Sequence, residues 1–157
     1  MSRAGFPEIA TLVPQTGPMC LLDRVIEHRP GHTVCAVDPG RSGLLAEPDA
    51  SVPAWVGLEY MAQCIAAHGG LIARQHGQAP RPGLFLGSRR VRFGVERFAG
   101  GRELRVSARH HHGERGLVAF DCEIQEATGG APLVSGRLNV YIVESWGELG
   151  AIGTDGS

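Results

Sequence analysis

The sequence contains no lysine, so its fifteen basic residues are all arginine. Sixteen acidic residues balance them to a formal net charge of -1, and no basic field is available to attract nucleic acid or an anionic membrane. Long apolar runs are also missing, because none approaches the roughly 18 residues that a membrane-spanning helix requires. We therefore expect a soluble, cytoplasmic protein that binds no nucleic acid and does not span a membrane.

Paired cysteine motifs are absent as well. The four cysteines form no Cys-x-x-Cys pair, and no N-terminal run resembles a signal peptide, so free thiols are expected. A hydrophobic content of 43% with 20% charged residues excludes a disordered chain, and 157 residues suit one compact domain. We assign residues 1–147 to that domain and residues 148–157 to a flexible tail.

The first regular structure that the sequence predicts is a β-hairpin. Residues 20–26 have the apolar density of a buried strand, and Arg29, Pro30 and Gly31 supply a turn. Residues 32–38 then alternate between the two faces of a second strand. Residues 40–52 follow neither the helical nor the strand period, and we interpret them as a long loop.

One helix is predicted, over residues 54–74. Pro53 opens it, because the fixed φ of proline suits a first helical turn, and Ser51 is the predicted cap. Apolar residues lie on nearly every face of this helix. We therefore expect it to be buried all round by a sheet, by a partner subunit or by both.

From residue 83 onward the hydrophobic period changes to two. Four alternating runs are separated by glycine-rich turns, at residues 84–93, 103–110, 116–125 and 133–143. This pattern predicts an antiparallel meander. Together with the hairpin and the buried helix, it indicates an α+β domain in which one curved sheet wraps around a central helix.

Several motifs resemble those of the hotdog-fold β-hydroxyacyl-ACP dehydratases of fatty-acid synthesis. They are Leu21-Leu22-Asp23-Arg24-Val25, the later Pro53, and Leu58-Glu59-Tyr60-Met61-Ala62-Gln63. A closer similarity is to the small hotdog proteins of aryl-polyene and xanthomonadin-type pigment clusters, which are described as 3-hydroxyacyl-ACP dehydratases. Its motifs are Pro18-Met19, Pro53-Ala54-Trp55 and Gly136-Arg137-Leu138-Asn139-Val140-Tyr141. The resemblance covers residues 14–143.

This resemblance implies a hotdog fold and a dimer in which the sheets of two subunits join, with acyl-pantetheine tunnels along the interface. It also implies that Glu59 is the catalytic carboxyl group, which protonates the hydroxyl as it leaves. A carboxyl group in an apolar helix would be desolvated, which suits a general acid. The alternative is that the carboxylate of Glu59 simply reaches solvent at the edge of the helix or caps backbone groups.

Three further positions match the family's site. Gln63 lies four residues after Glu59, on the same helical face, where its amide could orient the carboxyl group or merely satisfy its own polar atoms. Ala54 and Trp55 stand at the helix start, where backbone N–H groups lack an intrahelical acceptor. They match the positions whose N–H groups receive the thioester carbonyl.

One departure from the family concerns the base that removes the α-proton. The family places a histidine eight residues before the proline that Pro53 matches, and an ungapped count puts Leu45 there. Glu47 or Asp49 in the same loop could stand in, although a carboxylate is a weaker base than imidazole. His68 lies nine residues after Glu59 and cannot share its helical face, so we expect it to be packed or to face a partner.

The remaining candidates carry weaker signals. His110, His111 and His112 are expected in an exposed turn rather than in a metal site, and no metal is expected. Cys64 is expected to have a packing role. Arg90 and Arg92 share one predicted strand face and match the region where the dehydratases carry basic residues near the tunnel mouth. Their guanidinium groups would suit the phosphopantetheine phosphate or an acidic carrier protein, although a solvated face would look the same.

The leading hypothesis is dehydration of (3R)-3-hydroxyacyl-ACP thioesters to trans-2-enoyl-ACP in fatty-acid or polyene-type assembly. No resident cofactor is expected, because the substrate is carried on the phosphopantetheine of an acyl carrier protein, the expected partner. One alternative is a non-catalytic or half-site subunit that pairs, as a heterodimer rather than a homodimer, with a hotdog subunit bearing the histidine. Another is an acyl thioesterase, in which one helix carboxylate activates water.

Overall fold

The structure is a computed structural model that describes residues 5–41 and 45–143. The flexible tail predicted for residues 148–157 lies outside this range. Within the described residues, no helix combines the length and the apolar character needed to cross a membrane.

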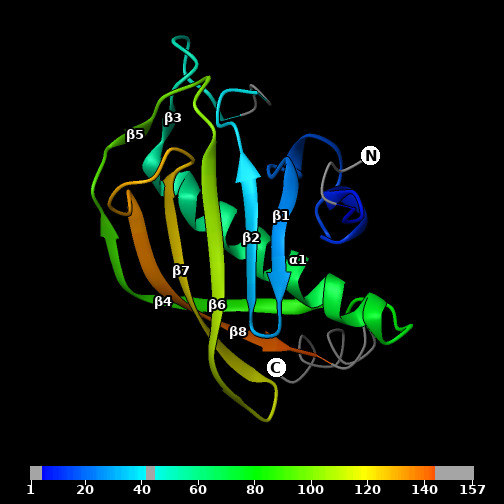
Figure 1. Ribbon diagram of the computed structural model, residues 1–157. Helices are drawn as coiled ribbons and strands as arrows, with labels where there is room; N and C mark the ends of the chain where they lie inside the picture. The colour runs from blue at the N-terminus through cyan, green and yellow to red at the C-terminus, as the bar shows by residue number, and fades with distance from the viewer. Residues whose placement is uncertain (1–4, 42–44, 144–157) are drawn as a thin grey trace, which may run out of the picture.

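Six antiparallel strands form the main sheet, in the order β1-β2-β6-β7-β8-β4 (Figure 1). Their bounds are β1 Arg24–Arg29, β2 His32–Val37, β4 Gly83–Phe93, β6 Leu104–Glu114, β7 Leu117–Glu126 and β8 Val134–Ile142. The predicted hairpin is confirmed as β1 and β2. Strand β1 starts later than predicted, since the N–H of Leu21 donates to the side chain of Gln63 rather than to a neighbouring strand.

The position of β4 differs from the predicted meander. Strands β6, β7 and β8 follow one another as expected, but β4 pairs with β8 at the edge of the sheet and β6 pairs with β2. The reason is a second, two-stranded sheet that the sequence did not indicate, in which β5 (Arg97–Phe98) pairs with β3 (Val52–Pro53). Because β5 pairs with β3, the chain moves away from β4 before β6 begins, and β6 pairs with β2 instead of β4.

The predicted helix is present as a short 3-10 turn, η3 (Ala54–Val56), followed by α1 (Gly57–Gln75). Figure 1 shows α1 lying along the inner face of the curved sheet, where it packs on β2, β6 and β7. The prediction that Ser51 caps the helix is wrong. Its hydroxyl donates to Asp49 Oδ1 at 2.6 Å and accepts from Arg97 Nε at 2.8 Å.

Helix α1 is not buried on every side within one chain. Its sheet-facing residues are fully buried, among them Met61 and Cys64 at 0% exposure. A strip on the other side consists of Leu58, Ala62 and Ala66, which are half-buried, and the exposed Gly69. Burial all round, predicted from the apolar composition, would therefore need a further molecule over this strip.

An N-terminal segment packs across α1 and contains two 3-10 turns, η1 (Ile9–Thr11) and η2 (Gly17–Met19). Its apolar side chains Ile9, Leu12 and Val13 are buried in the core. The backbone of Leu12 lies so close to Gly70 that a Cβ added to residue 70 would be 2.5 Å from the carbonyl oxygen of Leu12. This contact fixes the segment against the helix.

Candidate functional site

The first turn of α1 holds the carboxyl group that the sequence singled out. Glu59 is half-buried, and its Oε1 accepts a hydrogen bond from Gln63 Nε2 at 3.0 Å. The predicted contact between these two residues is therefore present. Oε1 also accepts a bond from Gln15 Nε2 at 3.2 Å, so two amide groups converge on one carboxyl oxygen.

Gln63 is held in one orientation by the N-terminal segment. The side chain is fully buried, its Oε1 accepts the backbone N–H of Leu21 at 2.9 Å, and its Nε2 donates to the carbonyl of Met19 at 2.8 Å. A backbone N–H can only donate, so the amide oxygen must face Leu21 and the amide nitrogen must face Glu59. Gln63 thus satisfies its own amide and orients the carboxyl group at the same time.

The turn at the helix start offers fewer free amides than predicted. The N–H of Ala54 donates to the carbonyl of Glu96 at 2.9 Å, so the expectation of an unpaired amide at this position is wrong. The reason is the β3–β5 pairing, which brings the chain around Glu96 against the turn. Trp55 is the second residue of this turn, and its N–H has no acceptor within the turn.

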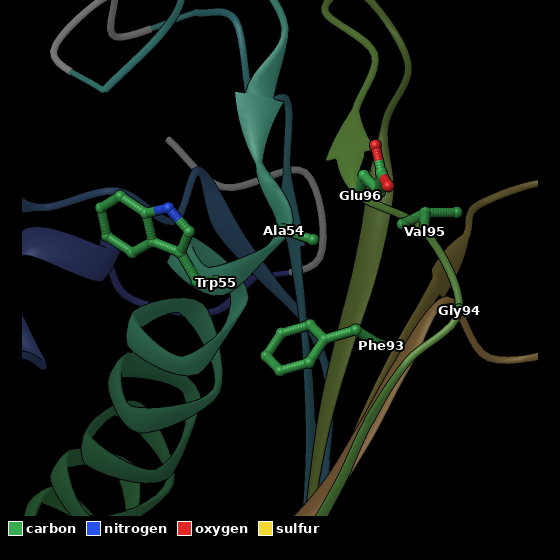
Figure 2. Close-up of a pocket in the computed structure, with 6 residues that line it drawn as sticks. All are labelled: Ala54, Trp55, Phe93, Gly94, Val95 and Glu96. Atoms are coloured by element: carbon green, nitrogen blue, oxygen red, sulfur yellow. The ribbon is translucent and has the colours of Figure 1, made fainter.

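A pocket of about 390 Å³ opens beside this turn. Its lining comes from the helix start and from the chain after β4, with Ala54, Trp55, Phe93, Gly94, Val95 and Glu96. Figure 2 shows Phe93 pointing toward the start of α1 and Trp55 extending outward from the turn. Trp55 is 62% exposed. Glu59 does not line this pocket, so the enclosed apolar surroundings predicted for its carboxyl group are incomplete in a single chain.

The loop before the helix contains the two acids that could replace the expected base. Leu45 packs against the core, and Glu47 forms an ion pair with Arg97 at 3.2 Å. Asp49 accepts bonds from the hydroxyl and the N–H of Ser51, which hold the pKa of its carboxyl group below the ordinary value. Both acids are thus engaged locally, and Asp49 is a still weaker base than an ordinary carboxylate.

All seven histidines lie within the described residues, and none of them is hydrogen bonded to Glu59. His68 is buried on the sheet-facing side of α1, where its Nδ1 is 2.7 Å from Thr33 Oγ1. The prediction that His68 is packed away from Glu59 is confirmed. Burial and three neighbouring histidines lower the pKa of His68 to about 4.

His110, His111 and His112 are exposed at the end of β6, in a strand rather than a turn, and no metal-holding group of side chains occurs among the described residues. Cys64 is buried in the core, and a hydrogen bond with Cys35, together with burial, raises the pKa of its thiol. A protonated, buried thiol is a poor nucleophile, which agrees with the predicted packing role.

The arginines on β4 are exposed, but simple alternation does not describe them. The pairs Arg89–Arg137 and Arg92–Ser135 leave one extra residue in β4, and Arg90 adopts a positive φ of 54°. This is a β-bulge. The prediction that Arg90 and Arg92 share a face is therefore wrong, and the register places Arg89 on the face of Arg92 instead.

Gln15 is the residue of this site that the sequence analysis missed. It lies 44 residues before Glu59, outside the helical spacing that identified Gln63. No short motif surrounds it in the sequence. Only the folding of the N-terminal segment over α1 brings its amide to the carboxyl group.

Comparison with known proteins finds a solved structure that is similar to this chain in both sequence and fold. The chain in the dehydratase heterocomplex ApeI:P from Xenorhabdus doucetiae is 29% identical, with a TM-score of 0.86, over 95% of this chain and 99% of that one. Two other similar structures show the fold alone. One is the E. coli PaaI protein from the phenylacetic acid degradation operon, which is 12% identical with a TM-score of 0.58, over 79% of this chain and 80% of that one. The other is a hypothetical thioesterase with coenzyme A from Streptococcus pneumoniae TIGR4, which is 16% identical with a TM-score of 0.57, over 76% of this chain and 84% of that one.

No curated protein sequence matches the chain. Residues 7–149, by contrast, match the ApeP-like family, described as ApeP dehydratase. This match includes the whole sheet, the N-terminal segment and the helix that carries Glu59. The hotdog fold expected from the sequence is thereby confirmed, and the chain belongs to the ApeP-like family of dehydratases.

Proposed function

We propose that this chain is the carboxyl-bearing subunit of a two-subunit dehydratase that converts (3R)-3-hydroxyacyl-ACP thioesters to trans-2-enoyl-ACP. The observation that carries the proposal is the site of Glu59. Two amide groups hold its carboxyl group, and no histidine is hydrogen bonded to it. The described residues thus hold a positioned carboxyl group and place no histidine in hydrogen-bond contact with it.

The reaction needs both groups. A base removes the proton from the carbon next to the thioester carbonyl, the C2–C3 double bond forms, and the C3–O bond breaks as the hydroxyl group takes a proton and leaves as water. Glu59 would supply that second proton. The N–H of Trp55 is available to stabilise the negative charge that develops on the thioester oxygen. The base then has to come from another subunit.

The surface of β4 supports such a partner. It is an edge strand of 11 residues, and Phe85, Leu86 and Phe93 on it are 51%, 56% and 47% exposed. An edge strand with exposed apolar side chains is a template for pairing with another sheet. Because the similar ApeI:P protein is a dehydratase heterocomplex, we propose a hotdog partner with a histidine rather than a second copy of this chain.

The substrate would arrive on an acyl carrier protein, in the cytoplasm. The exposed guanidinium groups of Arg90 and Arg92 suit the phosphate of phosphopantetheine or an acidic carrier surface, although the β-bulge keeps the two side chains from sharing one strand face. The chain itself needs no resident cofactor for this reaction, because the thioester is already attached to its carrier.

The test uses a purified β-hydroxyacyl-ACP and mass spectrometry of the acyl chain. We expect enoyl-ACP when the chain is mixed with a histidine-bearing hotdog partner, and none with either protein alone. Glu59→Gln in the mixture should lower the rate by at least about a hundredfold, while sedimentation shows the complex intact. Glu47→Gln, in the exposed pair with Arg97, is the matched control and should keep full activity.

Each other outcome would overturn the proposal. Enoyl-ACP from the chain alone would indicate an active homodimer. Free carrier thiol without enoyl product would indicate a thioesterase. Unchanged turnover in Glu59→Gln would remove Glu59 from the chemistry and leave only the family assignment.

A further inference from the structure

We propose that Gln15 is a positioning residue that acts with Gln63 to place the catalytic proton of Glu59 on Oε2. This inference rests on the proposed function, because it concerns the same carboxyl group. It adds a residue from the N-terminal segment, which carries none of the sequence motifs of the site.

The geometry distinguishes the two carboxyl oxygens. Gln15 Nε2 and Gln63 Nε2 both donate to Glu59 Oε1, at 3.2 Å and 3.0 Å. Among the described residues, Glu59 Oε2 receives no hydrogen bond. An oxygen that already accepts two N–H groups is a poor site for a proton, so the proton of the neutral acid resides on Oε2. The same two bonds stabilise the carboxylate after that proton has moved to the leaving hydroxyl.

Packing does not explain why residue 15 is a glutamine. Its Oε1 is buried and has no hydrogen-bond partner among the described residues. A buried acceptor without a donor destabilises the folded state, and an apolar side chain of the same length would avoid that penalty. The amide is therefore unfavourable for stability, and its one hydrogen bond, to Glu59, accounts for its presence.

The segment around Gln15 is anchored on both sides, which fixes the position from which the Gln15 amide contacts Glu59. Before it, the backbone of Leu12 packs against Gly70 of α1. After it, the carbonyl of Met19 accepts a bond from Gln63. Gln15 thus approaches Glu59 from a segment that is itself attached to the helix and to the other amide.

The test compares Gln15→Met and Gln15→Glu with the unchanged chain, each reconstituted with the partner subunit. We expect Gln15→Met to melt at the same or a higher temperature and to keep KM. Its kcat should fall about tenfold, the effect of losing one hydrogen bond to a charged group. A structural role predicts the reverse, a lower melting temperature with kcat unchanged, and that result would overturn the inference.

Gln15→Glu gives a second readout through its pH profile. A glutamic acid can donate to Glu59 Oε1 only while it holds a proton, so activity should recover as the pH is lowered. A profile of the same shape as that of the unchanged chain would contradict a donor role for residue 15.

The hydrogen bond can also be tested without activity, which separates this inference from the proposed function. In ¹⁵N-labelled protein, we expect Glu59→Leu to shift the side-chain amide resonances of both Gln15 and Gln63. Glu47→Leu, which removes an exposed carboxyl group, should leave both in place. If Gln15 does not respond to Glu59→Leu, the inference fails even where the dehydratase is active. If it responds in a protein without dehydratase activity, only the proposed function fails.

Discussion

Mild acid should destabilise this fold through one buried histidine. His68 is 4% exposed, and its ring lies 5.3 Å from that of His28 and 5.7 Å from that of Phe120. Its Nδ1 is hydrogen bonded to the hydroxyl of Thr33 at 2.7 Å, and the same hydroxyl is hydrogen bonded to His28 Nδ1 at 2.8 Å. Burial is the main cause that lowers the pKa of His68 to about 4, and His28, His110 and His32 add like charge when protonated.

The sign and the size follow from proton linkage. In the unfolded chain His68 takes up a proton at its ordinary pKa of 6.5, whereas in the folded chain it does so only near 4. Between these values the unfolded state binds more protons, so stability is present above pH 6.5 and is lost as the pH falls toward 4. At about 1.4 kcal/mol for each pKa unit, the full loss is about 3 kcal/mol, and about 2 kcal/mol of it falls between pH 7 and pH 5.

The assay is urea unfolding at pH 7 and pH 5, for the unchanged chain and for His68→Gln. Glutamine keeps a polar group near Thr33 but does not titrate, so the variant should lose about 2 kcal/mol less between the two pH values. The comparison removes the contributions of other groups, including His28 and His32, whose pKa values burial also lowers. An equal loss in both proteins would refute the reasoning, because His68 would then not be the buried titrating group.

Two further predictions use matched pairs of variants. Gly70→Ala would place a Cβ 2.5 Å from the carbonyl of Leu12 and should destabilise the fold by about 2 kcal/mol in urea unfolding, while Gly69→Ala, which meets nothing within 4 Å, should stabilise it by about 0.5 kcal/mol. Equal effects would show that the N-terminal segment does not pack on α1 as described. Phe85→Asp should weaken assembly with the partner at least tenfold in sedimentation, whereas Leu117→Asp, also 51% exposed but not on β4, should not. The same affinity in both variants would contradict β4 as the interface.

Local patterns were enough to predict most of the elements. The turn at Pro30 and Gly31 gives a hairpin, period-two alternation gives the long strands, and the apolar run after Pro53 gives the helix. These signals come from neighbouring residues, so they need no knowledge of the rest of the chain. Pairing between strands is different, because alternation identifies a strand without naming its neighbour. The edge position of β4 and the two-residue β3–β5 sheet were missed for this reason.

The candidate site shows the same division. The contact between Glu59 and Gln63 follows from their spacing of four on one helix. The contact with Gln15 spans 44 residues, and the bond from Ala54 to Glu96 joins two segments that meet only through β3 and β5. Spacing along the sequence could not have predicted either. At Arg90 a bulge interrupts the alternation, and no residue type in that stretch signals it.

The pocket at the helix start and the edge strand β4 adjoin each other. Phe93 ends β4 and lines the pocket beside Trp55, which lies one helical turn before Glu59. A subunit paired along β4 would therefore also cover the pocket at the start of the helix that carries Glu59. This predicts two separable losses: a variant on β4 should lose assembly and turnover together, whereas a variant at Gln15 should lose turnover with assembly intact. Turnover that survives the loss of assembly would show that the acid finds its base within this chain.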